Sequence, residues 1–431
     1  MSFINSVCWY IATFFLISSG LFYTFKLKFV QFDFKNIFKS IRKKEVNASI
    51  TPFMTLTLAL AARIGVGSLA GIALSIYYGG RGTLFWIWLS TIITIPNSFV
   101  ESVLAIIYHQ KKGNYYNGGP AYYIKKGLGF RKLAFFYSFI IAICYLGGFL
   151  AIQANTIAVS LNNYLNIPLI LSGIILSLIT YLVIVKGLKR ITQFTSFLVP
   201  VMGIIYLTIT LIIIVSNINK VPSILLSIFY EAFNIKSLGW GIFSSIIIGI
   251  QRGIFSSEAG IGTGAIASGI SNSKNPIDQG YLQMFGIYFT SFIICTSTAF
   301  IILTSNINID SFNNPNGIEI TLFALNNHLG NYGTIVFLLI VLSFAFSTII
   351  SGYYYGGSNL EYMGLNIKKK IINIIVVIIL LIGSIMPPTK LWCIVDIGVA
   401  ILAVINSLSI FLLNGDIDKV YKKGSGKYDR Q

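Results

Sequence analysis

Long runs of apolar residues, separated by short polar segments, dominate the chain. About 20 apolar residues in a helix are enough to cross the hydrocarbon core of a bilayer. About eleven runs approach or exceed that length, and they lie at residues 4–25, 51–79, 83–109, 133–160, 168–187, 192–216, 239–270, 282–304, 331–355, 370–387 and 391–414. The pattern predicts an all-α integral membrane protein with about 11 transmembrane helices.

Lys and Arg gather in every second loop between the apolar runs. The clusters lie within residues 26–44, 111–132, 186–190, 368–370 and 419–430, and Lys274 follows the seventh run. Because cytoplasmic loops carry an excess of Lys and Arg, these loops are expected to face the cytoplasm. The pattern predicts a multi-pass protein of the cell membrane, plasma or inner, with its N-terminus outside and its C-terminus cytoplasmic.

Two of the loops on the opposite side are longer and partly apolar. They run from Val221 to Ser237 and from Ser311 to His328. Their composition predicts short helices that lie on the outer face rather than cross the membrane.

Two of the apolar runs contain glycine-rich interruptions near their centres. The first, in TPFMTLTLALAARIGVGSLAGIALSIYYGG at 51–80, contains Gly65, Gly67 and Gly71 beside Arg63. The second, in IQRGIFSSEAGIGTGAIASGI at 250–270, contains Gly253, Gly260, Gly262 and Gly264. Backbone groups freed by an unwound helix are costly in hydrocarbon unless they find partners. Helix ends at such breaks can bind a carboxylate or a cation.

Setting the first helix aside leaves ten runs, which divide into two groups of five that enter the membrane from opposite sides. Each group begins with an interrupted run, and paired breaks of this kind mark the central site of many transporters. The predicted organisation is an extra N-terminal helix and basic loop (1–50), a first five-helix repeat (51–217), an external connector (218–238), a second five-helix repeat (239–414) and a basic cytoplasmic tail (415–431).

The glycines and charged residues of these runs could also have purely structural roles. Small residues three or four apart mark close helix packing as well. Glu258 lies near the centre of its span and needs a partner there. Arg63 and Arg252 are candidate partners, and Glu101 in the third span would pair with whichever is left. Glu258 would then be either half of a structural ion pair or a ligand for substrate.

Composition narrows the function further. Of the 431 residues, 55% are hydrophobic and 10% are charged, and a mean hydropathy of +0.79 excludes a soluble globular domain. The net charge of +18 indicates membrane orientation and contact with anionic lipid rather than binding to nucleic acid. No obligate protein partner is evident.

The residue types that enzymes need are scattered. Cysteines 8, 144, 295 and 393 are isolated within apolar runs, without metal-ligand spacing, and are expected to be buried thiols. His109 and His328 are far apart at loop edges. The sequence therefore favours neither an enzyme nor a cofactor.

Six sequence blocks resemble the alanine or glycine:cation symporter family, also called the sodium:alanine symporters. The blocks are AARIGVGSLAGIA at 61–73, GGPAYYI at 118–124, IQANTIA at 152–158, GLKRI at 187–191, QRGIFSSEAGIGTG at 251–264 and AFSTIISGYYYG at 345–356. They follow the family's order over most of the chain.

The resemblance implies a leucine-transporter-type fold, a secondary active symporter, and a small neutral amino acid such as alanine or glycine as substrate. It places the amino acid between the two breaks and Na⁺, the coupling ion, in a separate site. The implied substrate-binding residues are Gly65, Val66, Gly67, Ser68, Gln153, Phe255, Ser256, Ser257 and Glu258. The implied Na⁺ ligands are Ala61, Ile64, Ser347 and Thr348.

The chain departs from the family pattern at both breaks. The family usually has GTGN at 65–68 and SNEAG at 256–260, whereas this chain has Val66, Ser68 and Ser257 in place of a Thr and two Asn. Cation coordination or substrate hydrogen bonding should therefore differ. Coupling to protons or another solute, a channel or uncoupled pore, and a non-transporting receptor with the same fold stay open as alternatives.

Overall fold

The chain is almost entirely helical in a computed structural model, which describes residues 3–43, 49–113, 115–233, 241–273, 275–313, 315–365 and 368–424. Lys274, the end of the 218–238 connector and the end of the 415–431 tail lie outside the described residues, and so does the side chain of Cys393.

The N-terminal half contains one short hairpin and a series of helices. In chain order the elements are α1 (Phe3–Lys26), η1 (Val30–Phe32), α2 (Phe34–Arg42), α3 (Pro52–Arg63), η2 (Gly67–Gly71), α4 (Ile72–Gly79), α5 (Thr83–Ile107), β1 (Gln110–Lys112), β2 (Tyr115–Asn117), α6 (Pro120–Lys126), α7 (Arg131–Ala142), η3 (Ile143–Phe149), α8 (Leu150–Leu165), α9 (Leu169–Ile184), α10 (Leu188–Ser216), η4 (Ile218–Lys220) and α11 (Val221–Phe233). Strands β1 and β2 pair antiparallel, with Lys111 opposite Tyr116.

The C-terminal half is helical throughout its described part. Its elements are α12 (Gly241–Ser257), α13 (Thr263–Ser268), α14 (Pro276–Tyr288), η5 (Phe289–Cys295), α15 (Thr296–Thr304), η6 (Ile309–Ser311), α16 (Ile318–Leu329), α17 (Tyr332–Tyr362), α18 (Lys369–Ile385), α19 (Pro388–Leu412) and α20 (Asn414–Gly424).

Every predicted apolar run corresponds to a helix or to a pair of helices in the described chain. Seven helical spans are long and apolar enough to cross a membrane, where α7–α8 and α14–α15, each continuous through a π-helical turn, count as one span apiece. The α3 helix and residues 67–79, which are bent by 54° relative to each other, make an eighth. The others are shorter: α9 has 16 residues, α12 has 17 and α18 has 17. At 1.5 Å per residue such a helix reaches only about 25 Å. The chain is a multi-pass helical membrane protein, and the count of 11 spans stays a prediction.

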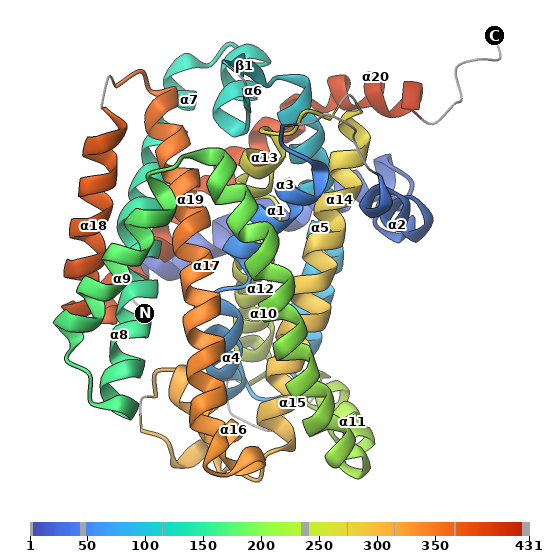
Figure 1. The fold of residues 1–431 in the computed structure, drawn as a ribbon. Helices are drawn as coiled ribbons and strands as arrows, with labels where there is room; N and C mark the ends of the chain where they lie inside the picture. The colour runs from blue at the N-terminus through green and yellow to red at the C-terminus, as the bar shows by residue number, and fades with distance from the viewer. Residues whose placement is uncertain are drawn as a thin grey trace.

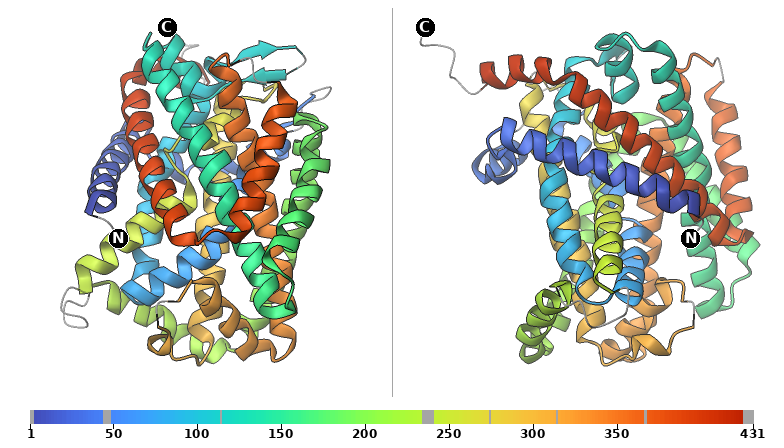
Figure 2. Two further views of the ribbon diagram at one scale, coloured as in Figure 1. Left: turned by 90° about the vertical axis from the view of Figure 1, so that its left-hand side faces the viewer. Right: turned by 180° about the vertical axis from the view of Figure 1, so that it is seen from behind.

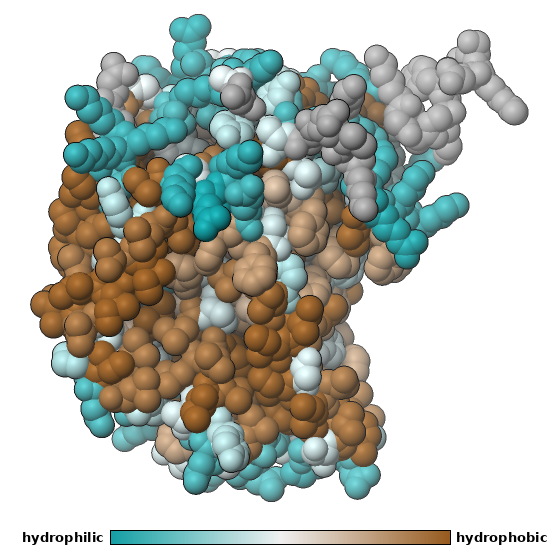
Figure 3. Space-filling model, in the orientation of Figure 1, coloured by the Kyte–Doolittle hydropathy of each residue, from teal (hydrophilic) through white to brown (hydrophobic). Residues whose placement is uncertain are grey.

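The helices form a bundle whose two ends differ in character. The hairpin, α2, α6 and α20 lie at one end, together with the α9–α10 and α17–α18 links, whereas α11 and α16 lie at the other (Figure 1). A brown apolar belt occupies the middle of the molecule, with hydrophilic residues above and below it (Figure 3). The basic loops therefore share one end, as their alternation predicts. Helices also form within both long loops of the opposite end, at α11 and α16.

The helix α5 lies at the core of the bundle. In its apolar window 83% of the residues are buried, against 33% for α10, which faces outward. Its neighbours include the second interrupted helix, α12, and α14. Residues on α5 can therefore reach the centre of the molecule.

The first helix, α1, packs beside the last long helix, α19. Both run obliquely across the back of the bundle, and the N-terminus lies at about mid-height (Figure 2). The Tyr23 hydroxyl donates to the Ile410 carbonyl at 2.5 Å, which fixes the pair. The outside location of the N-terminus stays a prediction.

The C-terminal helix α20 is tied to α5 at the basic end. The Tyr108 hydroxyl donates to Asp416 Oδ2 at 2.5 Å. This hydrogen bond holds the pKa of Asp416 below its ordinary value, and Lys419 adds to the effect. Near the same end, Asp33 caps α2 by accepting from the Asn36 N–H.

Candidate substrate and cation site

The first break separates α3 from η2. Helix α3 ends at Arg63, and Ile64 leaves helical geometry with ψ 72°. The π-helical turn Gly67–Gly71 follows, and the two halves meet at 54°. Glycines at 65, 67 and 71 permit close approach of neighbouring groups. The predicted interruption of this helix is thus present, at the predicted residues.

Hydroxyl groups of α17 meet the carbonyl end of α3. Thr348 Oγ1 lies 3.0 Å and Ser347 Oγ 3.2 Å from the Ala61 carbonyl oxygen, and Thr348 Oγ1 lies 3.5 Å from that of Ala62. A methyl group at Gly65 would collide with the Thr348 hydroxyl. Three of the four residues predicted to bind Na⁺ therefore meet at one point.

The fourth predicted Na⁺ ligand, Ile64, follows two residues after Ala62 and is fully buried. Its N–H donates to the Leu60 carbonyl at 2.8 Å, which completes the last turn of α3. A small cation takes oxygen ligands, and hydroxyl and carbonyl oxygens are the groups gathered here. The oxygen groups of this corner fit a hard cation.

Gln153 of α8 reaches the other side of the same break. Its side-chain Oε1 accepts from the Val66 N–H at 3.4 Å, although the two residues are 87 positions apart in the chain. The Ser68 hydroxyl turns back to donate to the Gly65 carbonyl at 2.8 Å. Hence Gln153 contacts the first break directly, whereas Ser68 closes a local turn.

Phe255 of α12 packs against the first break. A Cβ at Gly67 would lie 3.2 Å from the Phe255 ring. Gly67 is partly exposed, while Val66 and Ser68 on either side of it are buried. The ring therefore lies beside Gly67, the residue of the first break that is partly exposed.

The second break joins α12 to α13 through Glu258. Glu258 has a left-handed backbone (φ 53°). Its Oε1 accepts from the Tyr145 hydroxyl at 2.8 Å and its Oε2 from the Thr263 hydroxyl at 2.7 Å. The partners of Glu258 are thus hydroxyl donors, and neither expected arginine forms a direct ion pair with it within the described chain.

The predicted serines of this break face their own helix. Ser256 Oγ donates to the Gly253 carbonyl at 3.2 Å, and Ser257 Oγ donates to that of Ile254 at 3.3 Å. Ser257 also accepts from the Ala259 N–H. In this structure both hydroxyls therefore hydrogen-bond with the backbone of their own helix and do not point into the space between the breaks.

Polar side chains from other helices fix the backbone after Glu258. Gly260 and Gly262 have φ values of 83° and 103°, which disfavour a side chain. Asn406 Nδ2 donates to the Gly260 carbonyl at 2.8 Å, and the Tyr137 hydroxyl donates to that of Ile261 at 2.8 Å. The second break is a sharply turned and firmly held segment.

Arg63 lies in a buried polar cluster beside the second break. Its Nη1 donates to the Gln283 carbonyl at 3.5 Å. A Cβ at Gly264 would lie 2.7 Å from Arg63 Nη2 and 3.0 Å from Glu101 Oε1. Arg63 thus lies near Glu101 and interacts electrostatically with both Glu101 and Glu258. The positive charge of one guanidinium therefore stabilises two buried carboxylates.

Arg252 occupies a different environment, one turn of α12 before Phe255. Its guanidinium carbon lies 5.9 Å from the centre of the Phe255 ring. It also interacts electrostatically with Asp396, a buried residue of α19 that accepts from Asn5 Nδ2 at 3.4 Å. Arg252 therefore supports the aromatic side of the site instead of pairing with Glu258.

Three aromatic residues of the site were missed in the sequence. The Phe149 ring stacks on Phe255 at 5.8 Å and on Tyr145 at 4.5 Å, and Trp392 lies 5.8 Å from Phe255. A signal was present for two of them, because residues 145, 149 and 153 are four apart and share a helix face. Trp392 carried no comparable signal.

Comparison with known proteins gives a consistent result over the whole chain. The model of the sodium:alanine symporter family matches residues 1–431. The amino-acid carrier protein AlsT of Bacillus subtilis is 37% identical over 96% of this chain and 89% of its own length. The probable sodium/glutamine symporter GlnT of the same organism is 34% identical over 93% and 84%. The sodium/alanine symporter AgcS of Methanococcus maripaludis is 29% identical over 93% and 91%.

Among solved structures, a manganese transporter of Eremococcus coleocola is similar in fold alone. Its TM-score is 0.57 at 12% identity, over 86% of this chain and 78% of that one. The family match, the relatives and the two broken helices agree. The chain belongs to the sodium:alanine symporter family and is a membrane transporter, not an enzyme.

Proposed function

We propose that this protein is a secondary active symporter that imports a small neutral amino acid, alanine or glycine, together with Na⁺. The observation that carries the proposal is the convergence on one break of three separate helices. Gln153 of α8 meets the Val66 N–H, the Ser347 and Thr348 hydroxyls of α17 meet the Ala61 carbonyl, and α12 contributes Phe255 beside Gly67.

The two ends of the broken helix suit the two ends of a zwitterion. The N–H groups at 65–67 begin the second half of the helix, where a carboxylate is stabilised. Carbonyl oxygens at the end of α3 suit a cation or an ammonium group. In the proposal the amino acid lies beside Gly67 and Gln153, and Na⁺ lies between Ala61, Ile64, Ser347 and Thr348.

The surroundings favour a small side chain on the substrate. Phe255, next to Gly67, packs with Phe149 and Trp392 as an aromatic wall, and Val66 is buried. Of the relatives, AgcS is named for alanine and GlnT for glutamine. Glutamine is therefore the competitor that most directly tests the size limit.

The coupling ion supplies the energy for accumulation. One Na⁺ that moves down ~100 mV contributes ~2.3 kcal/mol, and a ~tenfold concentration gradient adds ~1.4 kcal/mol. The sum sustains a solute gradient of several hundredfold. Under the proposal the two broken helices move relative to the rest of the bundle, so that the site opens to one side at a time.

Uptake of radiolabelled alanine and glycine into proteoliposomes tests the proposal. The purified protein should take up both substrates in a saturable manner, only with an inward Na⁺ gradient, and excess glutamine should compete weakly. Uptake that persists without Na⁺ but follows a proton gradient would overturn Na⁺ coupling. Non-saturable flux with measurable conductance would favour a channel instead.

A further inference from the structure

A cavity lies at the basic end of the molecule, away from the two breaks. Its volume is about 520 Å³, and it lies between the end of α17, the α9–α10 turn, the start of α18 and the β1–β2 hairpin. None of the predicted substrate or Na⁺ residues lines it. The cavity is therefore separate from the candidate transport site.

Lysine side chains surround this cavity. Lys112, Lys186, Lys189 and Lys369 all line it, against one carboxylate, Glu361. Glu361 is already paired with Lys112 at 2.7 Å. The remaining three lysines form no ion pair within the described ranges, so the lining has an uncompensated positive charge.

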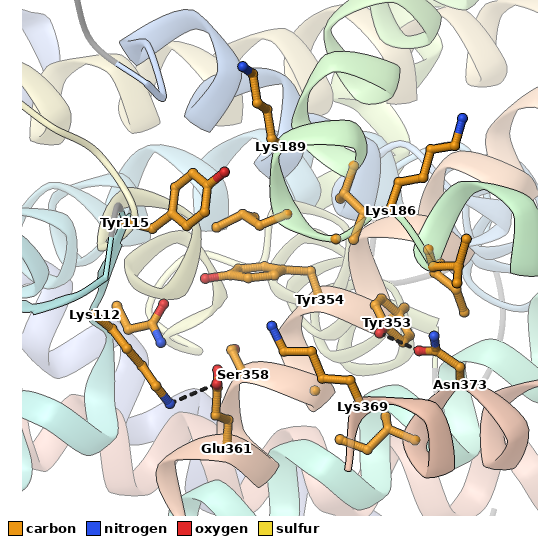
Figure 4. A pocket seen from close by; sticks show the side chains of 18 of the residues that line it. Lys112, Tyr115, Lys186, Lys189, Tyr353, Tyr354, Ser358, Glu361, Lys369 and Asn373 are labelled. Carbon is orange, nitrogen blue, oxygen red and sulfur yellow. Dashed lines mark hydrogen bonds and ion pairs between the residues drawn. The ribbon is translucent and has the colours of Figure 1, made fainter.

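The lysines stand on opposite sides of the opening (Figure 4). Lys186, on the α9–α10 turn, and Lys189, in the first turn of α10, lie at one rim with their amino groups directed away from the middle, while the Lys112–Glu361 pair lies at the other (Figure 4). Tyr354 and the amino group of Lys369 occupy the middle (Figure 4). An anion at the Lys369 amino group would contact three separate segments of the chain once the flexible Lys186 and Lys189 side chains turn inward.

Neutral hydrogen-bonding groups and apolar side chains complete the lining. The polar groups include Tyr115, Asn117 and Ser358, while Tyr353 already donates to Asn373 Oδ1 at 2.6 Å. The apolar side chains are Ile184, Val185, Leu188, Ile191, Leu365 and Ile372. The cavity combines cationic groups with an apolar wall, as a phosphate ester with an organic portion requires.

The cavity lies where the apolar belt ends. Val185, which lines it, is 48% exposed, and Ile371, next in the chain to the lining residue Ile372, is 47% exposed. Lysines at this level of a membrane protein meet lipid headgroups, and basic pockets between transmembrane helices bind them. The same lysines are also open to anions in solution.

We propose that this cavity binds a phosphate-bearing anion, either the headgroup of an anionic lipid or a free phosphate compound. The ligand neutralises Lys186, Lys189 and Lys369. It joins the α9–α10 turn to the α17–α18 link at the basic end. Lysine ammonium groups bind phosphate as point charges, so the site selects for charge more than for shape.

The test compares two triple variants that lose the same charge. The cavity variant is Lys186→Gln/Lys189→Gln/Lys369→Gln. The matched control is Lys35→Gln/Arg131→Gln/Lys132→Gln, which removes three exposed cations of the same end outside the cavity. Native mass spectrometry with phosphatidylglycerol or phosphatidylcholine measures lipid binding, and thermal unfolding in detergent with inorganic phosphate or chloride measures binding of free anion.

The cavity variant should bind phosphatidylglycerol about tenfold to a hundredfold more weakly than the wild type, and the control variant should not. That result identifies a lipid ligand. A phosphate-specific rise in unfolding temperature that the cavity variant alone loses identifies a free anion. Equal weakening in both variants, equal binding of the two lipids without a phosphate effect, or binding of neither probe would overturn the proposal. Each result is independent of amino acid uptake.

Discussion

The two breaks are built by different means. In the first, hydroxyl groups of α17 meet carbonyls of α3, and the amide of Gln153 meets a backbone N–H. No residue from 61 to 71 has a positive φ. In the second, Glu258, Gly260 and Gly262 all do, and tyrosine, threonine and asparagine side chains hold the turn.

The difference suggests separate roles: the first break is suited to binding a ligand, and the second to supporting the fold. The groups at the first break are neutral, and each has lone pairs or an N–H that a ligand can share. The second break uses a buried, charged carboxylate that holds two hydroxyl groups of the protein. We infer that the first break exchanges its partners during transport, while the second keeps its own. Substitutions at either break test this difference, and a substitution far from both breaks serves as the reference.

Glu258→Ala should have the largest effect. It leaves the Tyr145 and Thr263 hydroxyls without acceptors, at about 1–3 kcal/mol each, and leaves Arg63 with one carboxylate. We expect a lower midpoint of thermal unfolding and no uptake. Glu258→Gln, which keeps one acceptor oxygen, should lose less. Glu319→Ala at the surface end of α16 is the control, and equal midpoints for Glu258→Ala and this control would contradict the supporting role.

The substitutions Gly262→Ala and Gly67→Ala compare the two breaks directly, because they should affect stability and uptake differently. At Gly262 the added methyl meets the Tyr137 hydroxyl, and φ is 103°, so unfolding should become easier by about 2 kcal/mol or more. At Gly67 the methyl meets only the Phe255 ring, so the protein should remain folded while uptake falls at least about tenfold. Thermal unfolding and uptake are measured on both. A destabilised Gly67→Ala with a stable Gly262→Ala would reverse the comparison.

Gln153→Leu tests the amide side of the first break. The variant leaves the Val66 N–H unpaired and removes a group that the proposal places beside the substrate. The alanine concentration for half-maximal uptake should rise about tenfold or more, while the unpaired N–H costs about 1–3 kcal/mol, so the midpoint of unfolding should fall less than in Glu258→Ala. Gln193→Leu, on an exposed position of α10, is the control. An unchanged half-maximal concentration would exclude Gln153 from the substrate site.

Ser347→Ala tests the cation corner. The variant removes one oxygen beside the Ala61 carbonyl, so the Na⁺ concentration for half-maximal uptake should rise about three- to tenfold. Ser343→Ala, four residues earlier on α17, removes a hydroxyl that contacts only the Ile340 carbonyl in the described chain. The two variants should therefore differ in Na⁺ dependence but not in stability. Identical Na⁺ curves would place the cation elsewhere.

Asp416→Asn, far from both breaks, should have the smallest effect. Because the pKa of Asp416 is lower in the folded protein, its contribution is present above pH about 4 and is lost as the pH falls through the folded value. The protection of the α20 amides against hydrogen exchange, relative to an unstructured peptide at the same pH, should thus fall on acidification in the wild type and be nearly independent of pH in the variant. Uptake at neutral pH should not change. A loss of uptake would show that disturbance at a distance suffices, and would weaken the other assignments.

Much of the fold followed from local signals. Apolar runs located the helices, since a run of that length has few alternatives in a membrane. Gly65 and Gly67 located the first break because glycine leaves a helix easily. The lengths of α9 and α18 were harder to predict, because hydropathy does not fix where the last turn of a helix ends.

The candidate site was less predictable than the fold. The pairing of Ser347 with Ala61 came from the family resemblance, as hydroxyls are common in membrane helices. The partners of Glu258 could not be foreseen, because Tyr145 comes from another helix and only the packed bundle brings it near. Arginine was the expected partner on grounds of charge, but the direct hydrogen-bond partners of the carboxylate are hydroxyl groups.

The first helix is a lateral seal for the second break. Asn97 Nδ2 of α5 donates to the Leu16 carbonyl of α1 at 2.9 Å, and a Cβ at Gly260 would lie 2.6 Å from the Leu16 side chain. A chain that began after α1 would present the turn at Gly260 to hydrocarbon, where exposed backbone is not tolerated. The first helix therefore shields the unwound segment at Gly260 from the lipid.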